Sequence, residues 1–178
     1  MNSRYKFFAL AILAFLLGGV ASGASATALP ADPCALLAPA DIQVLAPNAT
    51  IGRGVMDGSM APLGVGCTYT WGPRSPEWGD SALTITVMDT SQAYPGVSAD
   101  LLKQGMLAQV KSGGANASQV PGVGDAALLT FEERVSSTTA QAYFAAKGIQ
   151  LTLTFHAGDS LSNKDKLIAL LKRAASRL

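Results

Sequence analysis

Three consecutive segments in the last third of the chain alternate apolar and polar residues and are separated by short turns. They span residues 125–133, 138–147 and 149–157. Alternation with a period of two is typical of strands that bury one face and expose the other. Strands that follow one another through tight turns pair antiparallel, and Lys147-Gly148 suits the turn between the last two. The sequence therefore predicts an antiparallel sheet at the centre of the fold.

Two further strands are predicted on the N-terminal side of these three. Residues 67–71 and 82–89 alternate in the same way. The segment 72–80 between them is rich in Pro and Gly and is expected to be a loop. The Gly-rich segment 48–63 is expected to be a loop that contains a poor strand.

Helices are predicted in three places. Pro33 and Pro39 each begin one turn of a short helix, because proline suits the first helical position. Ser98 is expected to cap a helix over residues 99–111, and Ser162 is expected to cap a closing helix. Apolar residues recur at helical spacing in the closing helix: Leu167, Leu170, Leu171, Ala174 and Leu178.

The order of these elements contains no internal linker and no repeat. We expect residues 27–178 to form one α+β domain, an antiparallel β-sheet with helices packed on its faces. A chain of about 150 residues is long enough to bury a core of its own.

The first 26 residues have the features of a secretory signal peptide. Arg4 and Lys6 precede an apolar run over residues 7–17, and small residues follow up to Ala26. The apolar run is about half of the roughly 20 residues that a membrane-spanning helix needs. We therefore predict cleavage after Ala26, with Ala28 as the second candidate, a periplasmic or secreted protein, and no stable membrane insertion after cleavage. An uncleaved membrane anchor is the alternative.

The net charge changes when this segment is removed. The full chain has 13 basic and 12 acidic residues. Without Arg4 and Lys6, 11 basic residues remain and the net charge is −1. Nucleic-acid binding requires clustered Lys and Arg, so the sequence predicts no nucleic-acid partner.

Basic residues do gather in the closing helix, at Lys164, Lys166, Lys172, Arg173 and Arg177. We interpret them as the solvated face of a helix that packs on the core, with the last ones complementing the helix dipole. A basic face that meets an anionic membrane or a partner is the alternative.

Cys34 and Cys67 are the only cysteines. In an oxidising compartment an even count of two predicts a single disulfide, which would fasten the first helix to the sheet. Redox-active pairs usually have the spacing Cys-x-x-Cys, and a zinc site needs about four ligands. With two distant cysteines and one histidine, the sequence predicts a structural disulfide and no metal site.

Three short motifs support a family resemblance. They are Asp32-Pro33-Cys34-Ala35-Leu36-Leu37, then Cys67-Thr68-Tyr69, and then the turn from Val120 to Ala127. Together they resemble secreted bacterial domains of unknown function, many of them lipoproteins. The resemblance implies a PsbP-like α/β/α sandwich and brings no catalytic residues. The chain differs from many members in lacking an evident lipid-attachment cysteine.

The turn Gly122-Val123-Gly124-Asp125-Ala126-Ala127 matches the letters of a dinucleotide-binding fingerprint. That fingerprint requires a preceding strand, a following helix and an acidic residue about 20 positions later. Here Pro121 precedes the turn and a strand-like run follows it. We interpret it as the entry to a strand, and no cofactor is predicted.

No coherent catalytic set is visible in the sequence. A triad would have to use His156, the only histidine, and the chain after the signal has no G-x-S-x-G elbow. Glu132 and Glu133 are adjacent, so on a strand they would point to opposite faces. Asp80, Asp89 and Asp125 lie at predicted loop edges, where capping and turn roles are usual.

The segment 72–80 is the most suggestive surface feature. It places Arg74, Glu77 and Trp78 on a loop close to Trp71, and Trp and Arg are frequent anchors in binding sites. The alternative is that Trp78 folds back and covers the edge of the sheet.

The sequence thus predicts an exported, non-catalytic domain that binds a protein, a peptide or an envelope ligand. The alternatives are a small exported hydrolase whose carboxylates pair only in space, and a structural accessory subunit of an envelope complex. The identity of the partner and the oligomeric state stay open at this stage.

Overall fold

The computed structural model describes residues 28–76 and 79–178. The predicted signal peptide, residues 1–26, and two residues of the predicted binding loop, Glu77 and Trp78, lie outside the described residues. The described strands are β1 (Val55–Asp57), β2 (Gly64–Ser75), β3 (Gly79–Asp89), β4 (Ala117–Gln119), β5 (Ala126–Glu132), β6 (Ser137–Phe144) and β7 (Ile149–His156). The α-helices are α1 (Pro39–Ile42), α2 (Thr90–Ala93), α3 (Ala99–Ser112) and α4 (Lys164–Ala175). Short 3₁₀ turns also occur, among them η1 (Pro33–Leu36), η4 (Ala145–Lys147) and η5 (Ser160–Asn163).

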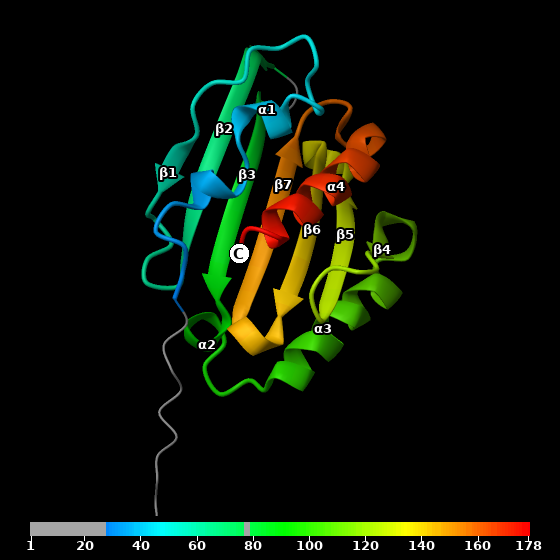
Figure 1. Cartoon of the computed structure of the whole chain (residues 1–178). Helices are drawn as coiled ribbons and strands as arrows, with labels where there is room; N and C mark the ends of the chain where they lie inside the picture. The colour runs from blue at the N-terminus through cyan, green and yellow to red at the C-terminus, as the bar shows by residue number, and fades with distance from the viewer. Residues whose placement is uncertain (1–27, 77–78) are drawn as a thin grey trace, which may run out of the picture.

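In the described part of the chain, one seven-stranded sheet runs in the order β1-β2-β3-β7-β6-β5-β4, and every neighbouring pair is antiparallel. After β3 the chain passes through α2 and α3 to the far edge of the sheet. It then returns through β4, β5 and β6, so that β7 pairs with β3 in the middle (Figure 1). The predicted antiparallel sheet is confirmed, and the fold class is α+β.

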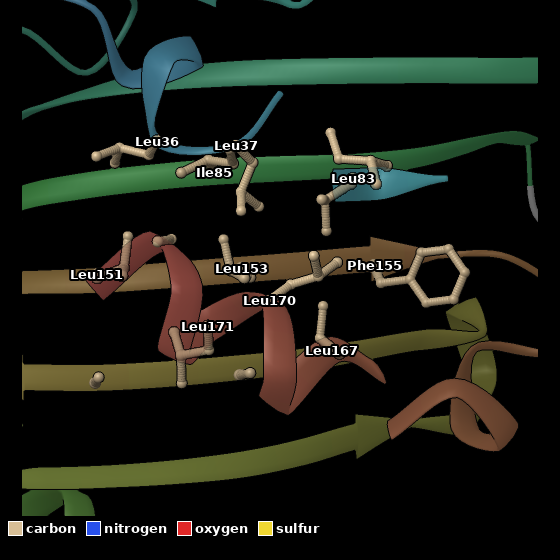
Figure 2. Packing of buried hydrophobic residues seen from close by; sticks show 14 of the residues in the cluster. Leu36, Leu37, Leu83, Ile85, Leu151, Leu153, Phe155, Leu167, Leu170 and Leu171 are labelled. Carbon is tan, nitrogen blue, oxygen red and sulfur yellow. The ribbon is translucent and has the colours of Figure 1, made fainter. Parts of the chain in front are cut away.

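One face of the sheet is covered by η1, α1 and α4. Figure 1 shows α4 crossing in front of β7 and β6, with η1 and α1 in front of β2 and β3. In Figure 2 the leucines of α4 and η1 point towards the apolar residues of β3 and β7. The main core includes these side chains, all fully or almost fully buried: Leu36, Leu37, Leu83, Ile85, Leu151, Leu153, Phe155, Leu167, Leu170 and Leu171.

The helix α3 lies on the other face of the sheet and covers only one end of it. Its residue Met106 packs with Ala126 and Leu128 of β5 and with Tyr143 of β6, which form a second, smaller cluster. Neighbouring residues of a strand point to opposite faces, so α3 and α4 are on opposite sides. Helices therefore pack on both faces, as the fold class predicted.

Most of the predicted helices and strands are confirmed. The predicted helix over 99–111 is α3, and the Ser98 hydroxyl accepts a hydrogen bond from the Leu101 amide at 3.3 Å. The poor strand expected within 48–63 is β1. The glycine motif is the entry to β5, and Gly124 has φ +57°. A Cβ at Gly124 would clash with the carbonyl oxygen of Tyr143.

Several predicted boundaries were wrong. The segment 72–80 is not a loop, because β2 continues to Ser75 and β3 begins at Gly79, with a shift in register after Trp71. The strand predicted over 138–147 ends at Phe144, and the chain turns through η4 and a left-handed Gly148. Residues 72–75 extend the β2–β3 hairpin, whereas residues 145–148 form a turn. An alternating sequence pattern alone does not distinguish a longer strand from a turn.

The start of the closing helix was also misplaced. Ser162 does not cap it, since α4 begins at Lys164 after the 3₁₀ turn η5. The side chain of Asn163, which precedes the helix, donates hydrogen bonds to the backbone carbonyl and the carboxylate of Asp159. The helix ends at Ala175 rather than at Leu178. Two short elements, β4 and α2, were missed because each has only three or four residues.

The N-terminal segment is fastened to the sheet by a disulfide. Cys34 of η1 bonds to Cys67 of β2, and their Cα atoms are 5.2 Å apart. The Tyr69 hydroxyl, on the same strand, donates to the carbonyl oxygens of Cys34 at 2.9 Å and of Leu37 at 2.6 Å. The predicted disulfide is therefore confirmed, together with its role of holding the first helical turn on the sheet.

A second link joins this segment to the C-terminal helix. The Asp41 carboxylate of α1 accepts hydrogen bonds from Arg173 and, at 2.7 Å, from Arg177. It also accepts one from the Ala38 amide at 3.0 Å, and Arg177 donates to the carbonyl of Leu36 at 2.9 Å. Two of the basic residues of the closing region therefore hold α1, a contact that helical periodicity does not reveal.

These contacts set the ionisation of Asp41. Burial raises its pKa, but the Ala38 amide and the two guanidinium groups together outweigh burial and hold the pKa below the ordinary value of 3.8. The carboxylate is therefore ionised in the folded protein at neutral pH, where both arginines pair with it.

Removal of the disulfide is expected to lower stability substantially. In the chain-entropy view, a bridge between cysteines 33 positions apart stabilises a fold by about 3–4 kcal/mol. We expect the double variant Cys34→Ala/Cys67→Ala to lose about that much free energy of unfolding in urea denaturation. Reductant should lower the stability of the wild-type protein and leave the variant unchanged. Equal stability of the oxidised and reduced wild-type protein would contradict the assignment.

Replacement of Asp41 is expected to separate α1 from α4. We expect Asp41→Asn to lower the free energy of unfolding at neutral pH by about 1–3 kcal/mol, since it weakens hydrogen bonds to charged partners. Asp80→Asn, a change at an exposed carboxylate, is the matched control. A variant as stable as the control would show that the link contributes nothing.

The same residue predicts a dependence on pH. Because its folded-state pKa is lowered, ionised Asp41 stabilises the fold above about 3.8. This contribution is lost as the pH falls through the folded-state pKa. Urea denaturation of wild type and Asp41→Asn, from neutral pH to about pH 3, should show the two stabilities converging as the solution becomes acidic. Curves that stay parallel down to the lowest pH would contradict this.

Candidate binding surface

The binding surface predicted from the sequence is not assembled as expected at the β2–β3 hairpin. Trp71 is 9% exposed and points into the main core, where its ring stacks on Phe155 with centroids 5.9 Å apart. Arg74 is exposed near the end of β2, and Glu77 and Trp78 lie outside the described residues. Within the described part, Arg74 alone among the four is presented to solvent.

A hollow of about 360 Å³ lies beside the disulfide. Its lining includes Asp32, Cys34, Arg53, Gly54 and Tyr69. Two polar groups of the lining have structural partners: the Asp32 carboxylate accepts a hydrogen bond from the Cys34 amide at 2.8 Å, and the Tyr69 hydroxyl donates to two carbonyls. We therefore assign this hollow to the packing of the N-terminal segment.

Two further observations support this assignment. A Cβ on Gly54 would lie 2.5 Å from the Cys67 sulfur and 2.7 Å from the Tyr69 ring, so the chain passes in close contact with the disulfide. Burial, and then the nearby carboxylates of Asp32 and Asp41, raise the pKa of the Tyr69 phenol above its ordinary value of 10.0. A phenol with a raised pKa and an engaged hydroxyl is a poor base or nucleophile.

The face of the sheet opposite α4 presents an ordered row of threonines. We call this side of β2, β3, β7 and β6 the open face, because no described helix packs over its centre. The register of the strands places five threonines side by side, one from each of five neighbouring strands: Thr68, Thr84, Thr154, Thr139 and Thr130. All five are partly exposed.

The hydroxyl groups of this threonine row are close to one another. Thr68 and Thr84 have their hydroxyl oxygens 3.1 Å apart, and Thr139 and Thr154 have theirs 3.5 Å apart. Neighbouring strands are about 4.8 Å apart, so these shorter separations show that the hydroxyls pair across β2–β3 and β6–β7 and are not evenly spaced along the row. A second, shorter row beside it contains Thr86, Thr152 and Gln141.

The second row leads into a groove of about 260 Å³ along the edge of α3. Leu101 and Met106 of α3 contribute an apolar wall, while Gln141 and Gln150 come from the sheet. Tyr94 stands at the groove with 37% of its surface exposed. The groove therefore combines apolar contact with uncharged groups that donate and accept hydrogen bonds.

Tyr143 adds one more uncharged group to the groove. Burial is the largest cause of the raised pKa of its phenol, and this outweighs the opposing hydrogen bond of Thr90. The side chain is therefore neutral at physiological pH.

Among the described residues, His156, Ser137 and Glu132 lie side by side on the sheet but not in the order of a catalytic triad. His156 of β7 pairs in register with Ser137 of β6, which in turn pairs with Glu132 of β5. In a triad the histidine stands between the serine and the acid. Here the serine stands between the other two, so Glu132 is not the neighbour that would orient His156.

Two of the other carboxylates considered from sequence, Asp89 and Asp125, have structural roles. Asp89 caps α2 and accepts a hydrogen bond from the Ser91 amide at 2.8 Å. Asp125 accepts one from the Ala145 amide at 2.7 Å. Among residues 28–76 and 79–178, no group of three His, Cys, Asp or Glu residues is placed to hold a metal ion. No helix in the same ranges is long and apolar enough to cross a membrane.

The sequence shows the threonines of each strand, but it does not show that they align in a row across the sheet. The motif Thr-x-Thr occurs in β2, β3 and β7, as Thr68-Tyr69-Thr70, Thr84-Ile85-Thr86 and Thr152-Leu153-Thr154. Repetition of this motif in three strands is the signal that points to the open face. The pairing of β3 with β7, which aligns the row, joins segments about 70 residues apart and is visible only in the structure.

A variant that lacks only the Tyr69 hydroxyl tests whether the residues around the hollow stabilise the fold. We expect Tyr69→Phe to lower the free energy of unfolding by about 1–3 kcal/mol, because a buried carbonyl loses its donor. Tyr94→Phe, at an exposed tyrosine, is the control and should leave stability nearly unchanged. Equal stabilities of the two variants would contradict the role assigned to the Tyr69 hydroxyl.

The open face and its groove form the candidate site of the described chain. Neither a scan against protein-family models nor searches of curated proteins and of solved structures gave a match. What the open face binds is therefore inferred from its own charge, its hydrogen-bonding groups and its shape.

Proposed function

We propose that this chain is an exported, non-catalytic binding domain, and that its ligand is a protein, a peptide or another component of the cell envelope. The single observation that carries the proposal is the open face, where partly exposed threonines lie on the sheet beside a groove at the edge of α3. Loops and exposed surfaces held by a rigid sheet are common binding sites.

Export is part of the proposal. The features of residues 1–26 indicate a cleaved signal peptide, and a disulfide persists in the oxidising compartments outside the cytoplasm. We place the mature protein in the periplasm or outside the cell. The resemblance to secreted bacterial domains with a PsbP-like sandwich belongs to the same proposal, and helices on both faces of an antiparallel sheet agree with it.

The non-catalytic assignment is supported by the environment of the polar groups. Asp32, Asp41, Asp89 and Asp125 hold backbone amides or arginines. The Tyr69 hydroxyl holds two backbone carbonyls. These groups stabilise the fold and are not free to act on a substrate.

The experiment is the capture of envelope material by immobilised protein. Thr154→Arg places a bulky charge in the middle of the open face, and Thr50→Arg places the same charge on an exposed threonine away from the sheet. We expect wild type and Thr50→Arg to retain the same component of an envelope extract from the source cells, and Thr154→Arg to lose it. Circular dichroism and thermal unfolding should show that both variants are folded.

Two results would contradict the proposal. One is retention of the same material by all three proteins, which would place binding elsewhere. The other is reproducible turnover in a broad screen of hydrolase substrates that a single substitution abolishes, which would favour the alternative of a small exported hydrolase. Stable co-purification with an envelope complex through a different surface would favour the accessory subunit.

A further inference from the structure

Positive charge is concentrated at the C-terminal end of the chain. Of the 13 basic residues in the sequence, five lie in or directly after α4, and we call their surface the basic face: Lys164, Lys166, Lys172, Arg173 and Arg177. The same segment contains one of the 12 acidic residues, Asp165. The rest of the chain after residue 26 has more acidic than basic residues. A strongly positive helix therefore belongs to an otherwise negative domain.

The basic face is the outer side of the layer that covers the sheet. Leu167 and Leu171 turn the opposite side of α4 into the main core. Figure 1 shows α4 in front of β7 and β6, with no described element in front of it. All five basic residues are exposed. Their charges are therefore available to a partner outside the molecule.

Contacts within the fold neutralise only part of this charge. Arg173 and Arg177 share the single carboxylate of Asp41, and their side chains remain 54% and 40% exposed. Within residues 28–76 and 79–178, no salt bridge involves Lys164, Lys166 or Lys172. The basic face therefore retains a surplus of positive charge beyond what Asp41 and Asp165 balance.

A layer of anionic phospholipid headgroups is the partner that complements this surface. Clustered Lys and Arg side chains are attracted to such a layer within about one Debye length. The 12 residues of α4 extend over about 18 Å, so the basic face can contact several headgroups at once.

Exposed apolar side chains near the basic face favour a membrane over a nucleic acid. Leu161, just before α4, is 48% exposed, and Val44, just after α1, is 45% exposed. Basic residues together with exposed apolar ones are typical of surfaces that lie in the headgroup region of a bilayer. The phosphates of a nucleic acid would gain nothing from these two side chains.

We propose that the basic face of α4 associates with anionic phospholipid headgroups and holds the protein at a membrane surface. The contact is peripheral, because the apolar side of α4 is part of the main core and stays there. The open face lies on the other side of the sheet and is directed away from the membrane. The proposal goes beyond the binding function of the open face, since it concerns a different surface and a different partner.

The test is sedimentation of the purified exported protein with lipid vesicles. The probes are vesicles of phosphatidylcholine alone and vesicles of phosphatidylcholine mixed with phosphatidylglycerol. We expect binding to the mixed vesicles at low ionic strength and none to the neutral ones. Binding should fall as salt is added, because salt screens interactions between exposed charges.

A pair of charge reversals makes the readout specific to α4. Lys164→Glu/Lys166→Glu places acidic residues in the first turn of α4, where they favour the helix dipole. The variant should stay folded and bind the anionic vesicles at least about tenfold more weakly. The matched control is Lys103→Glu/Lys111→Glu, at two exposed lysines of α3 on the opposite side. It changes the net charge equally and should bind like wild type, and thermal unfolding shows whether both variants are folded.

Three outcomes would overturn the proposal. The first is no binding to the anionic vesicles, or equal binding to both kinds of vesicle. The second is an equal loss of binding in the two double variants, which would make net charge the cause. The third is tighter binding to duplex DNA than to the vesicles at the same ionic strength, which would indicate a general polyanion surface. Envelope capture that depends on Thr154 tests the open face separately, so the two proposals fail independently.

Discussion

The pairing of β3 with β7 is the contact on which the rest of the structure depends. It joins the N-terminal hairpin to the C-terminal strands in an unbroken register from Ala82 opposite His156 to Asp89 opposite Ile149. A shift of one residue would turn the buried residues of one strand to the open face. The same register that brings Leu83 and Ile85 into the core next to Leu153 and Phe155 brings Thr84 next to Thr154.

The two faces of the sheet therefore differ in how far helices cover them. One is covered by η1, α1 and α4. The disulfide fastens the N-terminal segment to β2, and the contacts of Asp41 with Arg173 and Arg177 join that segment to the C-terminal part of the chain. The other is covered by α3 only above β4 and β5 and at the edge of β6. Stabilising contacts gather on the covered face, and the half-exposed uncharged groups gather on the other. This separation lets the open face vary in its contacts without loss of the core.

The parts of the fold that depend on local pattern were predictable from the sequence. The alternating residues of β7 predict both its buried and its exposed side, and Ser98 marks the start of α3 because its side chain caps the helix. Cys34 and Cys67 were paired correctly because no other partner exists. What failed were boundaries set by tertiary contacts, such as the extension of β2 past Trp71 and the start of α4 at Lys164.

The candidate site was harder to predict, for a physical reason. The sequence drew attention to Trp71 because tryptophan is common at binding surfaces, but position in the pleat decided its direction, and it stacks on Phe155 in the core. Threonine by itself attracts no attention, and the row exists only because five strands align. Asp41 and Arg173 likewise meet through the packing of the two ends of the chain.

The most direct test of the account is to map the contact surface by NMR. Backbone amide and threonine methyl resonances of the folded protein would be followed during titration with the envelope component that the immobilised protein retains. The account predicts shifts confined to the open face of β2, β3, β7 and β6 and to the groove at α3, with the largest at Thr84, Thr154 and Gln150. Shifts centred on the disulfide hollow or on the α4 face would contradict it.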